Sequence, residues 1–334
     1  MMRDAIVMWR NPRMVVLSAV CAAVYAATMI PFKVLVIFPG LAEVRPAAVF
    51  PVVFSFLFGP AGAWGAAFGN VVGDMLGGML GPGSIFGFLA NFAYGYIPYK
   101  LWEALYKDKT VVDELKSWQE KMQGLRNSVR IAGLIVAAVL ALGAAAMLVG
   151  QMKGVFNVKN FIEPGTGEIG LGDTAVLAIV CGSFFIIAAA LIMFFSPVRL
   201  MAVMLVACLA CAGVLGWAIE LLGFFPFQIF GIWILVNNFT ICTLLAPPLI
   251  LLLYPRVANS FMTYGDLLEE RESGPVRSRI GAAMVIFSVS ALFLAGILIG
   301  PEQFAGLFGS SSALLKGLAY SPFVLALFFG LFLL

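Results

Sequence analysis

Residues 65–74, Gly65-Ala-Ala-Phe-Gly69-Asn-Val-Val-Gly73-Asp, decide the kind of fold that this chain adopts. The four-residue spacing of glycine continues through Gly77 and Gly81. Residues four apart lie on one face of an α-helix, so the spacing predicts a helix with a smooth stripe where another backbone can approach closely.

Polar side chains accompany these glycines. Asn70 and Asp74 each follow a glycine by one position and form a neighbouring polar stripe. In the next segment, Asn91 is set into a stripe of glycines at positions 83, 87 and 95. Ionisable and amide side chains in apolar helices are costly in lipid, so Asn70, Asp74 and Asn91 predict a functional interior.

The composition of the whole chain gives its class. Hydrophobic residues make up 62% of the 334 residues and charged residues 11%, and the mean hydropathy is +1.04. Soluble globular proteins carry roughly 25% charged residues. The chain is therefore an all-α, polytopic transmembrane helical bundle. The net charge of +3 is not gathered in a basic patch, so a nucleic-acid partner is not expected.

Apolar segments of about 20 residues predict ten helices. The second is short because prolines and a Gly-Pro pair bracket it. The predicted segments are 14–32, 46–58, 61–79, 84–102, 130–150, 173–195, 199–222, 229–254, 280–299 and 314–334.

The basic residues predict the orientation of the chain in the membrane. With the N-terminus cytoplasmic, all but five of the 20 lysines and arginines fall on the cytoplasmic side. Such a bias predicts an even number of spans, with both termini in the cytoplasm. The five on the outer side are Lys33, Arg45, Lys153, Lys159 and Lys316.

Several kinds of chemistry are excluded by the residue content. The chain has no histidine, which removes histidine proton relays, Ser-His-Asp triads and histidine-bound metals. Its five cysteines lie in apolar segments. Cys208 and Cys211 have the spacing of a redox or metal motif, but no second pair of cysteines and no histidine accompanies them, so we expect two small hydrophobic side chains that are buried. We therefore expect no catalytic residues, no metal and no cofactor. Carboxylate chemistry through Asp74 and Glu220 is a third-ranked alternative that lacks a recognisable nucleophile or metal shell.

The first predicted helix carries two stripes of alanine four residues apart. One consists of Ala19, Ala23 and Ala27, and the other of Ala22 and Ala26. Such stripes suit close contact between helices, either with a partner protein or within the chain.

Longer motifs follow these stripes along the chain. An extended segment ending in Glu43-Val-Arg45-Pro46 precedes Leu57-Phe-Gly-Pro60, and Asn91-Phe-Ala-Tyr-Gly-Tyr-Ile-Pro98 follows. Later in the chain come Asn237-Asn-Phe, Ala246-Pro-Pro and Tyr254-Pro-Arg256, in that order. Over residues 14–106 and 200–256 the chain resembles the substrate-binding (S) components of energy-coupling-factor (ECF) vitamin transporters.

This resemblance implies a six-helix core that binds a vitamin-like molecule from outside, in a prokaryotic cytoplasmic (inner) membrane. It implies docking through the alanine-rich first helix onto a transmembrane coupling protein served by two cytoplasmic ATPases. Two helix pairs would be additions to this core. They could cover the surface that binds the coupling protein or replace that protein, so the sequence leaves open whether this chain uses the standard ATPase module. The expected organisation is four core helices in 1–106, a cytoplasmic connector helix in 107–129, an extra pair in 130–198, two core helices in 199–256, a cytoplasmic loop in 257–279 and a second extra pair in 280–334.

Polar residues predicted near the outer half of the bundle are the candidate substrate contacts. Glu43 and Arg45 either form an ion pair that sets the loop, or Arg45 binds an acidic substrate. Asn70 and Asn91 either hydrogen-bond the ligand or hydrogen-bond each other. The candidates are Glu43, Arg45, Asn70, Asp74, Asn91, Glu220, Asn237 and Asn238. The alternative function is a membrane scaffold or assembly subunit that uses the small-residue stripes for association alone.

Overall fold

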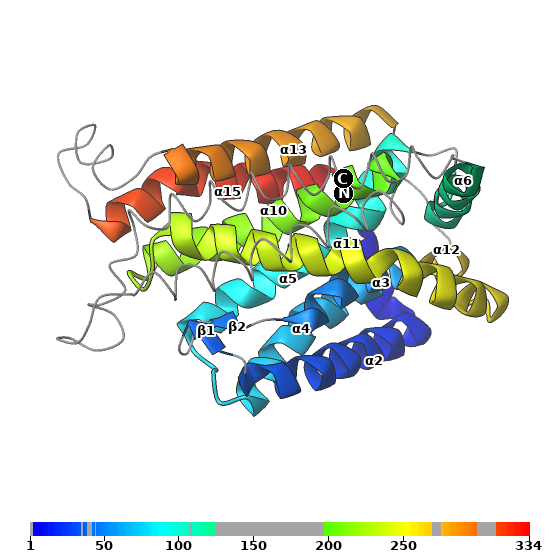
Figure 1. The fold of residues 1–334 in the computed structure, drawn as a ribbon, viewed down its shortest axis with the longest axis horizontal. Coiled ribbons are helices and arrows are strands. Elements are labelled where there is room, and N and C mark those ends of the chain that lie inside the picture. Colours follow the sequence, from blue (N-terminus) through cyan, green and yellow to red (C-terminus); the bar gives the residue numbers. More distant parts are fainter. Residues whose placement is uncertain are drawn as a thin grey trace. The chain divides into compact units, whose positions relative to one another are not determined.

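The computed structural model describes residues 3–34, 36–38, 42–43, 45–106, 109–124, 197–268, 275–298 and 312–334. These residues are helical apart from one short hairpin and the connecting turns (Figure 1). The elements are α1 (Arg3–Val7), the 3-10 helix η1 (Met8–Arg10), α2 (Pro12–Met29), η2 (Ile30–Val34), β1 (Val36–Phe38), β2 (Ala42–Glu43), η3 (Pro46–Ala48), α3 (Val49–Phe58), α4 (Pro60–Leu76), α5 (Pro82–Leu105), α6 (Val111–Gly124), α10 (Val198–Leu221), α11 (Phe227–Asn259), α12 (Tyr264–Leu267), α13 (Pro275–Leu298) and α15 (Ala313–Leu333).

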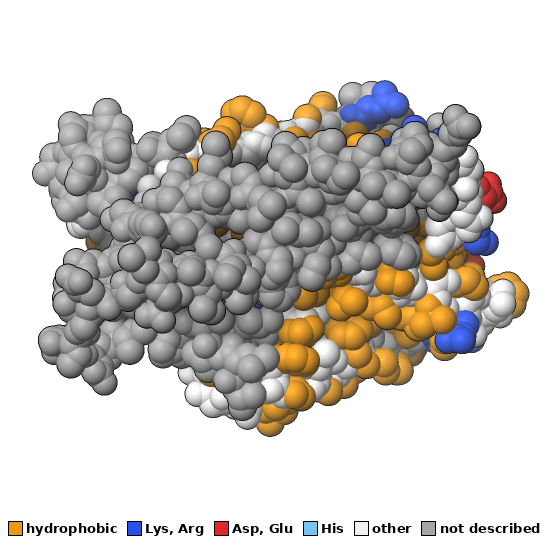
Figure 2. Space-filling view, viewed as in Figure 1, with side chains coloured by type: hydrophobic (Ala, Val, Ile, Leu, Met, Phe, Trp, Pro, Cys, Tyr) orange, Lys and Arg blue, Asp and Glu red, His pale blue; other side chains and the backbone are white. Residues whose placement is uncertain are grey.

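The chain divides into two compact units, residues 1–114 with 198–334, and residues 115–197. In the first unit, α2 packs on α4, α4 on α5, α5 on α10 and α10 on α11, while α3 lies against α4, α5 and α11. The antiparallel pair α13 and α15 packs along α10 (Figure 1). Five described helices are long and apolar enough to cross a membrane, namely those over residues 12–32, 198–221, 230–267, 277–297 and 314–333. Hydrophobic side chains gather on the described part of the face shown in Figure 2. The prediction of a polytopic helical bundle is confirmed.

Most of the predicted segments coincide with observed helices. The short second segment is η3 followed by α3, and the connector helix predicted after residue 106 is α6. The segments predicted over 130–150 and 173–195 lie outside the described residues.

Three glycines bring α2 and α4 into backbone contact. A Cβ atom on Gly65 would overlap the Cys21 side chain, and one on Gly69 would lie 2.8 Å from the carbonyl oxygen of Ala22. Gly73 meets Met29 at the end of the same contact. Only glycine permits this approach, so the sequence stripe does determine how α4 packs.

The predicted stripe is wrong beyond Gly73. Helix α4 ends at Leu76, with Gly77 as its C-cap, and Gly81 is the N-cap of α5. Gly78 has a φ of 70°, a left-handed conformation that glycine adopts without strain, and Pro82 begins the next helix. The last two glycines of the repeat therefore build a turn rather than a helix face.

One end of the bundle is closed by the N-terminal segment, and we call it the Asp4 end. The Asp4 carboxylate accepts hydrogen bonds from the hydroxyls of Tyr96 and Tyr99, each at 2.9 Å, and pairs with Lys100 Nζ at 2.7 Å. Nearby, the amide of Asn11 donates to the carbonyl of Leu267 at 2.9 Å. Helix α1 and helix α12 are thereby fixed to the same end of the bundle.

Replacing Asp4 with alanine is expected to lower stability by about 2 kcal/mol, because it leaves a buried ammonium and two tyrosine hydroxyls without their acceptor. Glu103 lies 3.8 Å from Lys100 and limits the loss. Thermal unfolding of the purified protein measures the effect, with Asp4→Asn as the conservative variant and the exposed Lys109→Ala as the control. A midpoint unchanged by Asp4→Ala would contradict a stabilising role.

Candidate functional site

The opposite end of the bundle is the Asp74 end, where α2 and α4 finish and α3, α5 and α11 begin. The chain between α2 and α3 crosses this end as η2, a β-hairpin and η3. In the hairpin, β1 and β2 pair antiparallel, with Val36 opposite Glu43. The hairpin leads to Arg45, the N-cap residue of η3.

Arg45 fastens this crossing segment to two helices. Its side-chain Nη1 donates to Asn70 Oδ1 on α4 at 3.1 Å, and its backbone N–H donates to Asn237 Oδ1 on α11 at 3.3 Å. The prolyl residue that follows, Pro46, fixes the start of η3. One residue thus connects the loop, α4 and α11.

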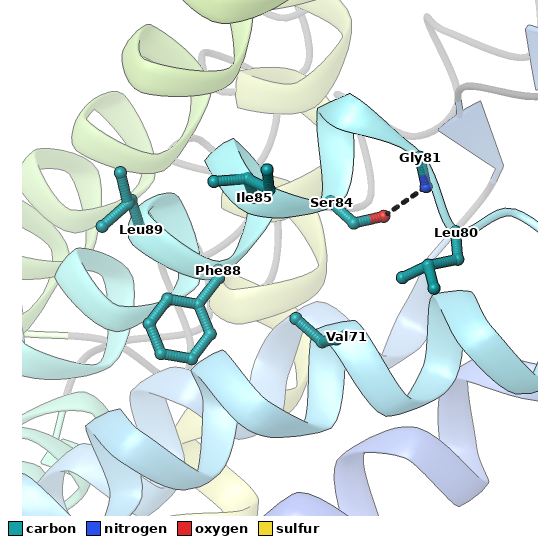
Figure 3. Close-up of a pocket in the computed structure, with 7 residues that line it drawn as sticks. All are labelled: Val71, Leu80, Gly81, Ser84, Ile85, Phe88 and Leu89. Carbon is teal, nitrogen blue, oxygen red and sulfur yellow. Dashed lines mark hydrogen bonds between the residues drawn. The ribbon is translucent and has the colours of Figure 1, made fainter.

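Asp74 accepts hydrogen bonds from two other helical positions. Its Oδ2 receives the amide of Asn70 at 3.2 Å and the hydroxyl of Ser84 at 2.9 Å. Ser84 in turn accepts the backbone N–H of Gly81 at 3.3 Å, which closes the first turn of α5 (Figure 3). Ser84 is not among the residues that the sequence predicts for the site, although a serine three residues after the glycine of a Gly-Pro helix start is a capping signal.

Asn70 occupies the centre of this network and is 3% exposed. Its amide oxygen accepts from Arg45, while its amide nitrogen donates to Asp74. An amide can accept and donate at once, so Asn70 links a cation to an anion across one buried side chain. We call Arg45, Asn70, Asp74 and Ser84 the polar network.

Asn91 belongs to a second contact beside the polar network. It accepts the hydroxyl of Tyr25 at 3.0 Å and donates to the carbonyl of Gly87 at 2.8 Å. A Cβ atom on Gly87 would lie 2.6 Å from the Asn70 amide nitrogen, so Asn70 and Asn91 are separated by this glycine. Each amide therefore has partners of its own, rather than the mutual hydrogen bond that the sequence left open.

The two asparagines of α11 face α10 and the loop. Asn237 donates to Asn238 Oδ1 at 3.2 Å, and Asn238 donates to Cys211 Sγ at 3.6 Å. Deeper in the bundle, the Tyr94 hydroxyl contacts the thiols of Cys208 and Cys242. The described cysteines are buried and free of disulfides.

Glu220 makes contacts of a different kind from those of the polar network. Its Oε1 pairs with Lys316 Nζ at 2.8 Å, and its Oε2 accepts the backbone N–H of Phe227 at 3.2 Å. Trp217 donates to the carbonyl of Gly317 at 2.8 Å on the same contact. The Glu220 carboxylate thus joins α10 to α15 and to the start of α11. Of Glu43, the structure describes the backbone pairing in β2 alone.

The two alanine stripes of α2 face in different directions. Ala22 and Ala26 are buried against α4, close to the glycines that cross there. Ala19, Ala23 and Ala27 are exposed. The stripe of Ala22 and Ala26 therefore packs within the chain, and the stripe of Ala19, Ala23 and Ala27 faces outward, so contact of the second stripe with a partner protein stays a prediction.

The apolar spans define a polytopic membrane protein, and a partly buried polar network lies where its loop meets α4, α5 and α11. Comparison with protein families finds a match to the QueT transporter model over residues 15–180, about half of the chain. The chain belongs to this family of ECF transporter S components.

The family match begins within α2, includes the described elements through α6 and ends before α10 begins. It therefore leaves the similarity of residues 200–256 to the last two S-component helices as a prediction. No curated protein and no solved structure matches the chain.

Proposed function

We propose that this protein captures a small, vitamin-like organic nutrient at the Asp74 end and delivers it across the membrane with an ATP-driven coupling module. The observation that carries the proposal is the polar network, which draws residues from the loop, α4 and α5 to one place and adjoins Asn237 of α11. Polar groups held in this way, with Asn70 and Ser84 buried and Arg45 and Asp74 partly buried, are costly in a membrane protein and mark substrate pathways.

The network suits a ligand because hydrogen bonds join its members, from Arg45 to Asn70 and from Asn70 and Ser84 to Asp74. A ligand with donors and acceptors at matching positions can exchange with these bonds without leaving a buried group unpaired. Asp74 is only partly buried, whereas Asn70 beneath it is almost inaccessible. Asp74 is thus the member that a ligand reaches first, with Asn91, Asn237 and Asn238 as further contacts.

The distribution of positive charge supports an outward-facing Asp74 end. Arg45 and Lys316 belong to this end, whereas Lys100 and the arginines that precede α2 belong to the Asp4 end. By the positive-inside rule, the Asp4 end faces the cytoplasm and both termini lie there. The protein is then a multi-pass component of a prokaryotic cytoplasmic membrane, and it is not an enzyme.

The exposed stripe of Ala19, Ala23 and Ala27 is the proposed contact for a transmembrane coupling protein. Val16 and Val20 are exposed beside it, at 61% and 51%. The C-terminal pair of helices packs on α10 and leaves this stripe uncovered among the described residues. The additional helices are therefore compatible with docking through α2.

Native mass spectrometry of the protein purified from its own host in mild detergent tests the proposal. We expect a co-purifying small molecule on the wild-type chain, and a loss of about 10- to 100-fold in its retention for Asp74→Ala and for Asn91→Ala. The matched control is Asn259→Ala, an exposed amide at the opposite end of α11.

Normal retention and normal uptake by both site variants would refute this assignment. A chain that carries partner subunits crosslinked at Ala19 or Ala23 but no small molecule would favour the scaffold function instead.

A further inference from the structure

The seam between α4 and α5 is open near the Asp74 end, where it forms a groove of about 600 Å³ (Figure 3). The described residues that line it are apolar apart from the Ser84 hydroxyl and the backbone of the turn, and none of them is charged. The lining residues are Val71, Leu80, Gly81, Ser84, Ile85, Phe88 and Leu89.

Aromatic rings fill the same seam towards the Asp4 end. Trp64 contacts Phe92 and Phe88, with ring centroids 4.7 Å and 6.1 Å apart, and Phe68 contacts Phe88 at 5.3 Å. Beyond Phe88 the side chain contributed by α4 is Val71, which is too short to continue the row of rings (Figure 3). The groove is thus the unfilled end of a packed aromatic seam.

The rim of the groove continues into an apolar surface. Ile85 is 66% exposed, Leu80 58% and Leu89 38%, and the neighbouring Met75 and Leu76 are exposed at 55% and 62%. In a helical bundle of a membrane transport family, such a surface faces hydrocarbon rather than water. The apolar lining and rim of the groove therefore match the acyl chains of a bilayer rather than a polar occupant.

Ser84 connects the groove to the polar network. It lines the groove, and its hydroxyl donates to Asp74 at 2.9 Å. Ser84 lies in the first turn of α5, where the helix is held by the Gly81 contact and by packing of Phe88 on Trp64 and Phe68. Material that fills the groove restricts this turn against α4, and so holds Ser84 beside Asp74.

We propose that the acyl chain of a membrane phospholipid occupies this groove and that its presence strengthens ligand binding at Asp74. The first part stands on the groove alone, and the second rests on the proposed function. A transmembrane partner helix is a poorer occupant, because the rim carries large side chains rather than the small-residue stripe that close helix contact needs.

Photo-crosslinking in phosphatidylcholine vesicles tests the occupant directly. A phosphatidylcholine with a photoreactive group in the middle of its acyl chain is expected to label peptides covering residues 71–89 more strongly than those of α15, whose Leu325 is 70% exposed. Val71→Phe should fill the groove and reduce this labelling to the level of α15, whereas Leu325→Phe should leave it unchanged. Equal labelling of both helices, or labelling unaffected by Val71→Phe, overturns the lipid site.

The coupling is tested by ligand retention in native mass spectrometry, before and after exhaustive delipidation. We expect delipidation to lower retention by about fivefold or more in the wild type and much less in Val71→Phe, whose ring replaces the acyl chain. Equal losses in the two proteins overturn the coupling. If no small molecule binds the wild type even with lipid, the proposed function and the coupling fail, while groove labelling still decides the lipid site.

Discussion

Glu220→Ala is expected to destabilise the protein by about 3–5 kcal/mol, because it leaves the Lys316 ammonium buried without a counter-charge. The two side chains are 4% and 6% exposed, and the pair joins α10 to α15. The variant also removes the acceptor for the Phe227 backbone N–H. Thermal unfolding in detergent should show a midpoint lowered on the order of 10 °C.

A second ion pair of the chain gives a matched control. Glu114 lies 3.6 Å from Arg199, whose side chain is 50% exposed, so Glu114→Ala should cost less than about 1 kcal/mol. The double variant Glu220→Met with Lys316→Met should regain much of the stability, because it removes both buried charges. If Glu220→Ala and Glu114→Ala have the same midpoint, the Glu220–Lys316 pair does not hold α15 in place.

Gly65→Ala is the second change with a large expected effect. A Cβ atom there would lie 2.9 Å from the Ser18 carbonyl oxygen and would overlap the Cys21 side chain. Backbone atoms cannot move aside as a flexible side chain can, so α2 must separate from α4, at a cost of about 1–3 kcal/mol. The unfolding midpoint in detergent measures this loss.

Gly83→Ala is the control for the same chemical change in a helix. The nearest atom to a Cβ on Gly83 is Ile219 Cδ1 at 3.7 Å, an ordinary contact. The variant should therefore unfold as the wild type does. Equal midpoints for Gly65→Ala and Gly83→Ala would show that the α2–α4 crossing tolerates a wider separation than its geometry indicates.

The class of fold could be predicted from the sequence because hydropathy and four-residue spacing report directly on spans and helix faces. Gly65, Gly69 and Gly73 were assigned to the right contact face. The same spacing failed at Gly77 and Gly81, because periodicity alone does not reveal that Gly78 and Pro82 impose a turn. A repeat of glycine is compatible with both a helix stripe and a loop.

The candidate site could be predicted only in part. Polar groups in apolar helices are conspicuous, so the sequence indicates Asp74 and Asn70, and they do lie together with Arg45. Glu220 was selected for the same reason, but its partner Lys316 lies 96 positions later in the chain. Pairing at that sequence distance depends on tertiary structure. Ser84 was missed because a serine near a turn is common in any sequence.

The crossing of α2 and α4 also has a mechanical consequence. Side chains between two helices absorb small displacements by changing rotamer, but at Gly65 and Gly69 the contact is made by backbone. A displacement of α2 is therefore expected to move α4 with it, so that the two helices move as one rigid body. Because α4 carries Asn70 and Asp74, a protein that docks on α2 would act on the polar network without touching it.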